Sequence, residues 1–123
     1  MKYLCLAYEE EQKLNGLSRS EWQALRQETL DYVEALRESG RLVTTYALQS
    51  ATTASTLEVR NGEVWVTDGP FTETKEQLGG FFLIEVADHD EALQVASRWP
   101  SARIGSIEIR PVEEALRLER RYG

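Results

Sequence analysis

Two short segments with uninterrupted apolar character restrict this chain more than any other feature. Every position from 3 to 8 is apolar, and so is every position from 81 to 84. Because side chains alternate between the two faces of a strand, such runs predict central strands buried on both faces. A chain of 123 residues is one domain by length, and it is too small to form a second covering layer of its own. The sequence therefore predicts one sheet with two apolar faces.

A long amphipathic helix is predicted over residues 18–39. Ser18 and Glu21 have the spacing of a capping box, and an apolar stripe follows them. Thr29 interrupts the stripe, and its ordinary interpretation is a hydroxyl that hydrogen-bonds the carbonyl one turn back. The alternative is that this part of the helix borders a cavity. The stripe consists of Trp22, Leu25, Tyr32, Val33 and Leu36.

The remaining elements complete a mixed α+β pattern. Asn61-Gly62 predicts a tight hairpin. Strands are expected over 42–48, 53–60, 63–67, 81–86 and 104–110, a second capped helix from Asp88 to Pro100, a loop over 9–17, and a tail or short helix over 112–123. Without the hairpin, the order of elements is the split βαβ of the ferredoxin-like fold. We therefore expect a single domain over 1–111, of ferredoxin-like topology with an inserted hairpin.

Two helices can cover only one face of this predicted sheet. The apolar runs at 3–8 and 81–84 nevertheless place apolar side chains on the other face as well. The simplest cover for that face is a second copy of the chain, packed sheet to sheet. The sequence thus predicts a homodimer that forms through the sheet faces.

The stretch from Asp68 to Gly80 has abrupt changes of local chemistry. Asp68-Gly69-Pro70 turns the chain after a strand, a polar run follows, and Gly79-Gly80 leads into the second apolar segment. This is more turn chemistry than a simple surface connection needs. It favours a loop that folds back over a cleft.

The same stretch carries a family resemblance. Asp68-Gly69-Pro70-Phe71 and the residues to Phe81 closely resemble the signature of the DGPF family within the YCII-related proteins, and the likeness extends from 1–3 to 105–111. The resemblance implies a dimeric α+β barrel. For an enzyme of the wider group, the resemblance implies an active-site pair of His and Asp, with the His on the first helix. That helix has no histidine here, and Thr29 stands about where the His would be, so the resemblance leaves open whether this protein is an enzyme.

Asp68 is the candidate catalytic residue. A carboxylate covered by apolar side chains such as Phe71 is poorly solvated, which suits a general acid or base. The alternative is that Asp68 only makes the turn by accepting backbone N–H bonds. The candidate ligand-binding residues are Thr29, Tyr46, Phe71, Thr72, Lys75 and Arg103. Lys75 lies among glutamates and has the alternative of a simple exposed ion pair, while Thr72 has the alternative of a helix cap.

Composition excludes several classes of function. A net charge of −7 disfavours a nucleic-acid partner. One Cys and one His cannot form a zinc cluster, and no metal site or cofactor is predicted. No apolar segment approaches membrane-spanning length, the start of the chain does not resemble a signal peptide, and a cytoplasmic protein is expected.

Three functions remain as hypotheses. The first is a dimeric small-molecule-binding protein with a ligand cleft under the Asp68–Gly80 segment. The second is a small lyase, hydrolase or isomerase that acts on a small organic acid, with Asp68 as acid or base and Lys75 or Arg103 holding the anion. The third is a non-catalytic partner of an extracytoplasmic-function sigma factor. Family members often resemble such companion proteins of sigma factors.

Overall fold

The computed structural model describes residues 1–122 and has a mixed α+β architecture. Its main sheet contains β1 (Lys2–Glu9), β2 (Leu42–Ala47), β5 (Gln77–Glu85) and β6 (Ser106–Pro111). All neighbouring strands are antiparallel, in the order β2-β5-β1-β6. The two apolar segments thus occupy the two central strands, which confirms this part of the sequence prediction.

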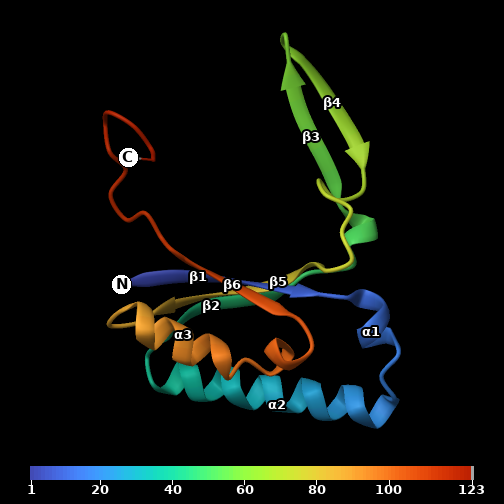
Figure 1. The fold of residues 1–123 in the computed structure, drawn as a ribbon, viewed down its shortest axis with the longest axis vertical. Coiled ribbons are helices and arrows are strands. Elements are labelled where there is room, and N and C mark those ends of the chain that lie inside the picture. The colour runs from blue at the N-terminus through green and yellow to red at the C-terminus, as the bar shows by residue number, and fades with distance from the viewer. Residues whose placement is uncertain (123) are drawn as a thin grey trace.

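The helices cover one face of the sheet, as Figure 1 shows. They are α2 (Arg19–Glu38) and α3 (His89–Ser97), followed by the short 3-10 helix η2 (Pro100–Arg103). Ser18 and Glu21 form the predicted capping box, with each side chain bonded to the other's backbone N–H. Asp88 caps α3 by accepting a hydrogen bond from the Glu91 N–H, at 2.9 Å.

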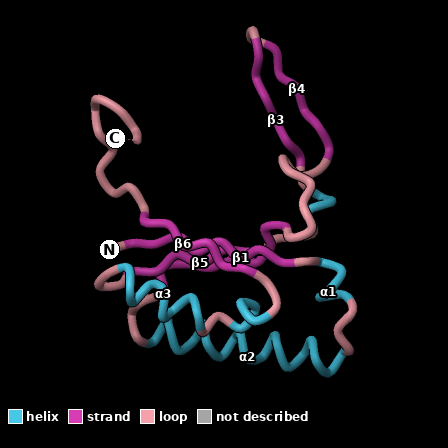
Figure 2. Tube along the Cα trace, viewed as in Figure 1, coloured by secondary structure: helices cyan, strands magenta, loops and turns pink. Residues whose placement is uncertain are grey.

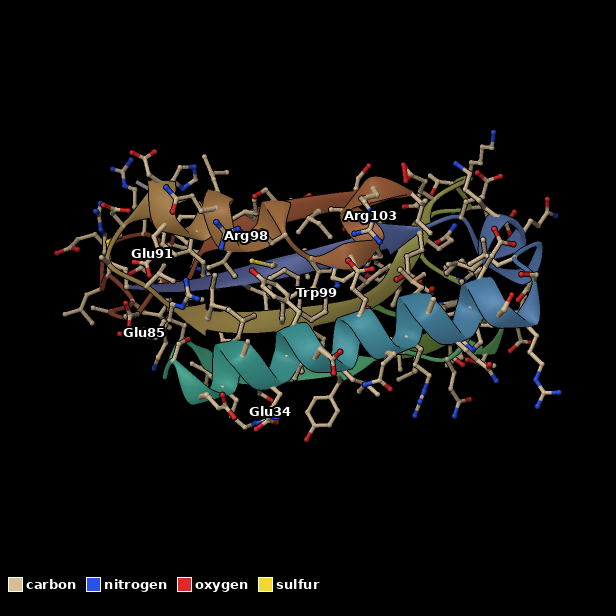
Figure 3. The ribbon with its side chains drawn as sticks, turned by 90° about the horizontal axis from the view of Figure 1, so that it is seen from below. Glu34, Glu85, Glu91, Arg98, Trp99 and Arg103 are labelled. Atoms are coloured by element: carbon tan, nitrogen blue, oxygen red, sulfur yellow. The ribbon has the colours of Figure 1, made fainter. Side chains whose placement is uncertain are left out.

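The hydrophobic core lies between the helices and one half of the sheet. Alternate residues of β1 and β5, among them Tyr3, Cys5, Phe82 and Ile84, are buried against the helices. From the helical side they meet Leu36, Val95, Ala96 and Trp99. Figure 3 shows Trp99 between α2 and the α3–η2 segment.

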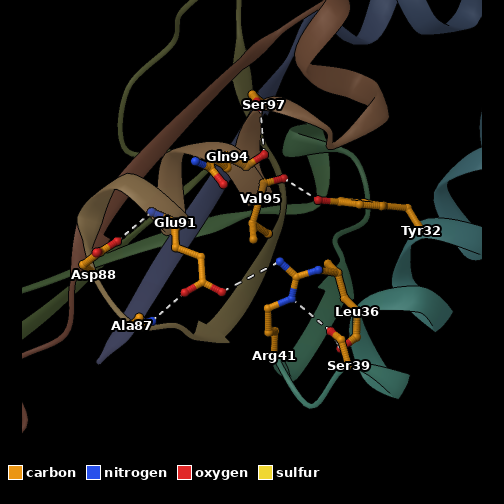
Figure 4. Close-up of polar contacts among 10 residues, drawn as sticks. All are labelled: Tyr32, Leu36, Ser39, Arg41, Ala87, Asp88, Glu91, Gln94, Val95 and Ser97. Atoms are coloured by element: carbon orange, nitrogen blue, oxygen red, sulfur yellow. Dashed lines mark hydrogen bonds and ion pairs between the residues drawn. The ribbon is translucent and has the colours of Figure 1, made fainter.

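Polar contacts join α2, α3 and the adjoining strands beside the hydrophobic core. The Tyr32 hydroxyl donates to the Val95 carbonyl of α3, at 2.7 Å, and so bridges α2 and α3 (Figure 4). Glu91 accepts a hydrogen bond from the Ala87 N–H and pairs with Arg41, 3.8 Å away. The core end of the molecule is therefore fixed by both packing and hydrogen bonds.

A two-stranded arm projects from the opposite face of the sheet (Figures 1 and 2). It consists of β3 (Ser55–Arg60) and β4 (Glu63–Asp68), preceded by the 3-10 helix η1 (Ala51–Thr53). Asn61 and Gly62 have φ values of 51° and 77°, which the predicted tight turn requires. The predicted hairpin is therefore confirmed, and every residue of β4 in it is exposed.

Four local predictions need correction. Residues 11–15 form a helix, α1 (Glu11–Asn15), in the predicted loop, because one helical turn is too short to show periodicity. Strand β5 begins at Gln77 and includes both glycines. Gly80 pairs with β1 and β2, and Gly79 lies at a register shift in the pairing of β5 with β1. The last strand starts at Ser106 because η2 uses the residues before it.

The fourth correction concerns Thr72. It begins no helical turn, and its backbone carbonyl accepts a hydrogen bond from the Gln77 side chain. Residues 112–122 form no helix and are exposed, which matches the tail among the two predicted alternatives of tail or short helix. Residue 123 of the predicted tail lies outside the described residues.

Candidate functional site

A cleft of about 730 Å³ lies along α2, between this helix and the sheet. It exists because small residues from three strands meet on the helical face of the sheet. Ala7 of β1 is opposite Gly80 of β5, and Gly80 is opposite Ala47 of β2. None of the three fills the space beneath α2, whereas Phe82 and Ile84 fill it further along β5. The same helix therefore packs on the core through Leu36 and borders the open space with other residues along its length.

The walls of this cleft are mostly apolar. The predicted stripe of α2 continues into it, so Trp22, Leu25 and Val33 line it together with Leu30. Trp22 is 46% exposed and Leu30 is 45% exposed, so both leave apolar surface uncovered. Trp99 forms the boundary with the core and also lines the cleft. A concave site of this size with apolar walls has the dimensions of a small-molecule pocket.

A few hydroxyl groups interrupt the apolar lining. Thr29 Oγ1 donates to the Leu25 carbonyl at 2.8 Å, and Thr45 Oγ1 donates to the Phe81 carbonyl at 2.9 Å. The protons of these two hydroxyls are therefore used internally, and only their lone pairs face a ligand. Ser101 differs, because its Oγ is buried without a hydrogen-bond partner among residues 1–122. Buried hydroxyls normally have a partner, so Ser101 is a candidate ligand contact.

Glu9 is the titratable carboxyl group at the sheet side of the cleft. Desolvation by burial raises its pKa, and the nearby charge of Glu11 raises it further. In Glu11 itself, hydrogen bonds from the Ser50 side chain and the Ala51 N–H lower the pKa. Glu11 does not line the cleft, so Glu9 is the member of this pair that a ligand can reach.

The structure places two of the predicted site residues in the lining, Thr29 and Tyr46. Thr29 fits both earlier interpretations, because it bonds the carbonyl one turn back and also borders the cavity. Tyr46 lies at the β2 edge, with its ring centroid 6.0 Å from that of Phe81. Asp68, Phe71, Thr72, Lys75 and Arg103 are not part of the lining.

The expected lid does not cover the cleft within one chain. Asp68 is exposed at the end of β4, and Phe71 is 82% exposed, so no apolar cover surrounds the carboxylate. Only Gly79 and Gly80 of the Asp68–Gly80 segment reach the cleft. The rest of the segment connects the projecting arm to β5 and remains exposed or partly exposed.

Arg103 and Lys75, the two cations among the predicted site residues, have carboxylate partners within the chain. Arg103 donates two hydrogen bonds to Glu28 of α2, each 2.7 Å long, and so ties η2 to the helix. Lys75 lies 3.9 Å from Glu10 and is mostly exposed. Both are surface ion pairs, which contribute little to stability. His89 is far along the chain from the first helix and contacts the Tyr3 ring, with centroids 5.6 Å apart.

Sequence reasoning missed Glu9, Ser101 and the role of Trp22. A signal for Glu9 was present, because it continues the alternate positions of Tyr3, Cys5 and Ala7, which face the helices. No local signal exists for Ser101, whose position depends on how η2 returns to the sheet.

In the part of the chain that the structure describes, no three His, Cys, Asp or Glu side chains come together as a metal-binding group. No helix within residues 1–122 is long and apolar enough to cross a bilayer.

Comparison with known proteins gives three findings. The family model described as YCII-related domain matches residues 1–115. An uncharacterised protein of Rhizobium meliloti (strain 1021) is 39% identical over 114 residues, which cover 91% of this chain and 92% of the relative. The solved structure of 5-chloro-2-hydroxyhydroquinone dehydrochlorinase from Burkholderia phenoliruptrix AC1100, in complex with 2,5-dihydroxybenzoquinone, has a TM-score of 0.58 at 14% identity, covering 94% of this chain and 96% of that chain. At this identity the likeness concerns the fold alone.

Proposed function

Since this chain belongs to the YCII-related domain family, we propose that it binds a small organic molecule in the cleft between α2 and the sheet. One observation carries the proposal, namely the open space of about 730 Å³ whose walls leave large apolar side chains uncovered. Exposed apolar surface in a concave site is stabilised when a ligand removes it from water.

The cleft favours a ring compound with polar substituents. Trp22 and Trp99 offer aromatic surfaces for stacking, and Ser101 offers a hydroxyl without a partner in the described part of the chain. Arg26 also lines the cleft and supplies a positive charge, which suits a carboxylate on the ligand. The dehydrochlorinase of similar fold was solved with a hydroxylated quinone, which supports the same choice of probes.

Isothermal titration calorimetry with a defined panel tests this function. The panel contains hydroquinone, 4-hydroxybenzoate, benzoate and a small aliphatic lactone, each titrated into wild-type protein and Trp22→Ala. We expect at least one ring compound to bind wild type and to bind Trp22→Ala about 10-fold more weakly, because an aromatic contact is lost. Absence of binding across the panel, or equal binding by both proteins, would contradict the proposal.

We propose further that the fold is the ferredoxin-like split βαβ and that two copies form a dimeric α+β barrel. The sheet order and the two helices on one face support the first part. For the second part, Leu4 pairs with Leu83 and Leu6 pairs with Phe81 on the face away from the helices. These side chains are only partly buried and form a continuous apolar patch at the centre of that face.

The projecting arm supports the same pairing. On one face of the hairpin, Leu57 is opposite Val66 and Val59 is opposite Val64. All four side chains are at least half exposed. The arm and the open sheet face lie on the same side of the molecule (Figure 1), so one twofold axis can cover both apolar surfaces at once. Sedimentation over a wide concentration range tests the dimer, and a well-folded monomer at every concentration would contradict it.

A further inference from the structure

Glu9 occupies a position built to hold a carboxylate at the cleft. It is the last residue of β1, and the pairing of β1 with β5 shifts register between Ala7 and Tyr8, which leaves Gly79 unpaired. A Cβ on Gly79 would lie 2.5 Å from Glu9 Oε2 and 2.7 Å from Glu9 Cδ. The carboxyl group therefore lies in the space that the missing side chain leaves, at a strand irregularity of the kind that re-aims side chains.

Glu9 is also the one carboxylate of its acidic run without an internal partner. Glu10 pairs with Lys13 and Lys75, both 3.9 Å away. Glu11 accepts hydrogen bonds from Ser50 Oγ at 2.6 Å and the Ala51 N–H at 2.8 Å. No hydrogen bond or ion pair to Glu9 occurs among residues 1–122. A partly buried carboxylate loses hydration without gaining a protein partner, and burial accordingly raises its pKa.

Ser101 provides a second and independent observation at the same end of the cleft. The residue is 8% exposed, and its Oγ has no partner in the described part of the chain. A Cβ on Gly105 would meet the Tyr8 carbonyl and would lie 3.4 Å from the Ser101 carbonyl. Ser101 is therefore close to the end of β1 that carries Glu9, and both residues line the cleft. One group accepts hydrogen bonds, and the other can donate or accept one.

We propose that Glu9 and Ser101 form the polar recognition site of the cleft for a hydroxylated aromatic ring. The Glu9 carboxylate accepts a hydrogen bond from a ring hydroxyl, and Ser101 Oγ bonds a second ring oxygen. The apolar walls of the cleft hold the ring itself. This inference rests on the proposed function, because it names the ligand chemistry of the same cleft.

The test compares two probes of the same ring, one with two hydroxyl groups and one in which methyl groups replace the two hydroxyl protons. Hydroquinone and 1,4-dimethoxybenzene are titrated into wild type, Glu9→Gln, Ser101→Ala and the matched control Glu10→Gln. Wild type and Glu10→Gln should bind hydroquinone more tightly than its dimethyl ether. In Glu9→Gln that preference should fall by about 10-fold to 100-fold, because a hydrogen bond to a charged acceptor is lost. Ser101→Ala should weaken hydroquinone by about 5-fold or more, as expected for one neutral hydrogen bond.

Gly79→Ala adds a variant that leaves the chemistry of Glu9 intact and moves it. Its new Cβ displaces only the end of a flexible side chain, so the fold should persist while the preference for hydroquinone falls. In the double variant Glu9→Gln/Gly79→Ala the loss should equal that of Glu9→Gln alone, because both changes act on one contact. Equal preference in wild type and Glu9→Gln, with the Trp22→Ala effect intact, overturns the role of Glu9 and leaves the proposed function standing. Wild type that binds no ring compound overturns both.

Discussion

Trp99 stacks on Phe82, with ring centroids 4.0 Å apart and ring planes inclined by 12°. Phe82 is fully buried in β5, and Trp99 follows the end of α3. Trp99 also contacts Tyr32 of α2 edge to face, at 6.1 Å. A single indole thus joins strand and helix, closes the packed core and forms the inner wall of the cleft.

Replacement of Trp99 by alanine should lower the free energy of unfolding by about 3–5 kcal/mol, because it removes a buried aromatic side chain and leaves a cavity. Trp22→Ala is the matched control, since Trp22 is 46% exposed and should cost about 1 kcal/mol or less. Urea denaturation followed by circular dichroism measures both. Similar losses in the two variants would show that the core does not end at Trp99.

Much of the fold was predictable because its determinants are local. The apolar runs gave the two central strands, Ser18 and Glu21 gave the start of the long helix, and Asn61-Gly62 gave the hairpin. Thr29, which interrupts the stripe of the long helix, was expected to bond the carbonyl one turn back, with a cavity border as the alternative, and both are found. Each of these signals spans a few residues and acts through backbone geometry or side-chain periodicity.

The site was less predictable because it depends on contacts between distant segments. The cleft exists where Ala7, Ala47 and Gly80 come together across three strands, and this register cannot be seen from any one of them. Arg103 was predicted to bind an anionic ligand, but its partner is Glu28, which lies 75 positions away. Lys75 likewise finds Glu10 instead of its sequence neighbours.

Three glycines of the sheet should differ in their tolerance of alanine. A Cβ on Gly105 would collide with the Tyr8 backbone carbonyl, and one on Gly80 would lie 2.9 Å from the Tyr46 carbonyl. Backbone must move in both cases, so we expect each substitution to destabilise the protein by about 2 kcal/mol or more. Gly79→Ala displaces only the Glu9 side chain and should cost less than about 1 kcal/mol. Thermal unfolding of the three variants gives the order, and a Gly79 variant as unstable as the Gly105 variant would contradict it.

The stability of Glu9→Gln relative to wild type should depend on pH. The pKa of Glu9 is raised above its ordinary value of 4.5 by burial, so the folded state binds this proton more tightly than the unfolded state. The tighter binding of this proton stabilises the folded state fully below pH 4.5, and this stabilisation is lost as pH rises through the pKa of Glu9 in the folded state. Glu9→Gln should therefore be more stable than wild type at pH 7 and similar to it near pH 4. Urea midpoints from pH 4 to pH 8 measure the difference.

Ser50→Ala supplies a control with the opposite sign. Hydrogen bonds from Ser50 and the Ala51 N–H lower the pKa of Glu11, so this group stabilises the fold above its ordinary pKa and loses that effect as pH falls. Without the Ser50 hydroxyl, the protein should lose stability at pH 7 more than near pH 3. Parallel pH profiles for Glu9→Gln and Ser50→Ala would contradict both assignments.

The Cys5 thiol should be unreactive until the protein unfolds. Cys5 is fully buried in β1, and burial raises the pKa of its thiol to about 12. At pH 8 the reactive thiolate is then roughly one in ten thousand of the folded molecules. Alkylation by iodoacetamide should be slow in buffer and should accelerate across the urea transition, with mass spectrometry as the readout. Rapid alkylation of fully folded protein would show that β1 opens locally.

The apolar face of the projecting arm provides a test of the proposed dimer. Two strands without further packing are marginally stable in water, yet this hairpin exposes four aliphatic side chains on one face. Val64→Thr/Val66→Thr keeps the β-branched shape and adds two hydroxyls to that face. If the face packs against a second copy, the dissociation constant of the dimer should rise by about 10-fold or more, because each of the two copies would bury unpaired hydroxyls at the interface.

The control for this change lies on the other face of the same hairpin. Glu58 is opposite Trp65 and Glu63 is opposite Arg60, and these pairs lie on the face away from the four aliphatic residues. Glu58→Gln/Glu63→Gln should therefore leave the dissociation constant within about 3-fold of wild type, since surface charges are screened by solvent. Sedimentation velocity over a dilution series measures all three proteins. An unchanged constant in the threonine variant, with an intact far-ultraviolet spectrum, would show that the arm takes no part in pairing.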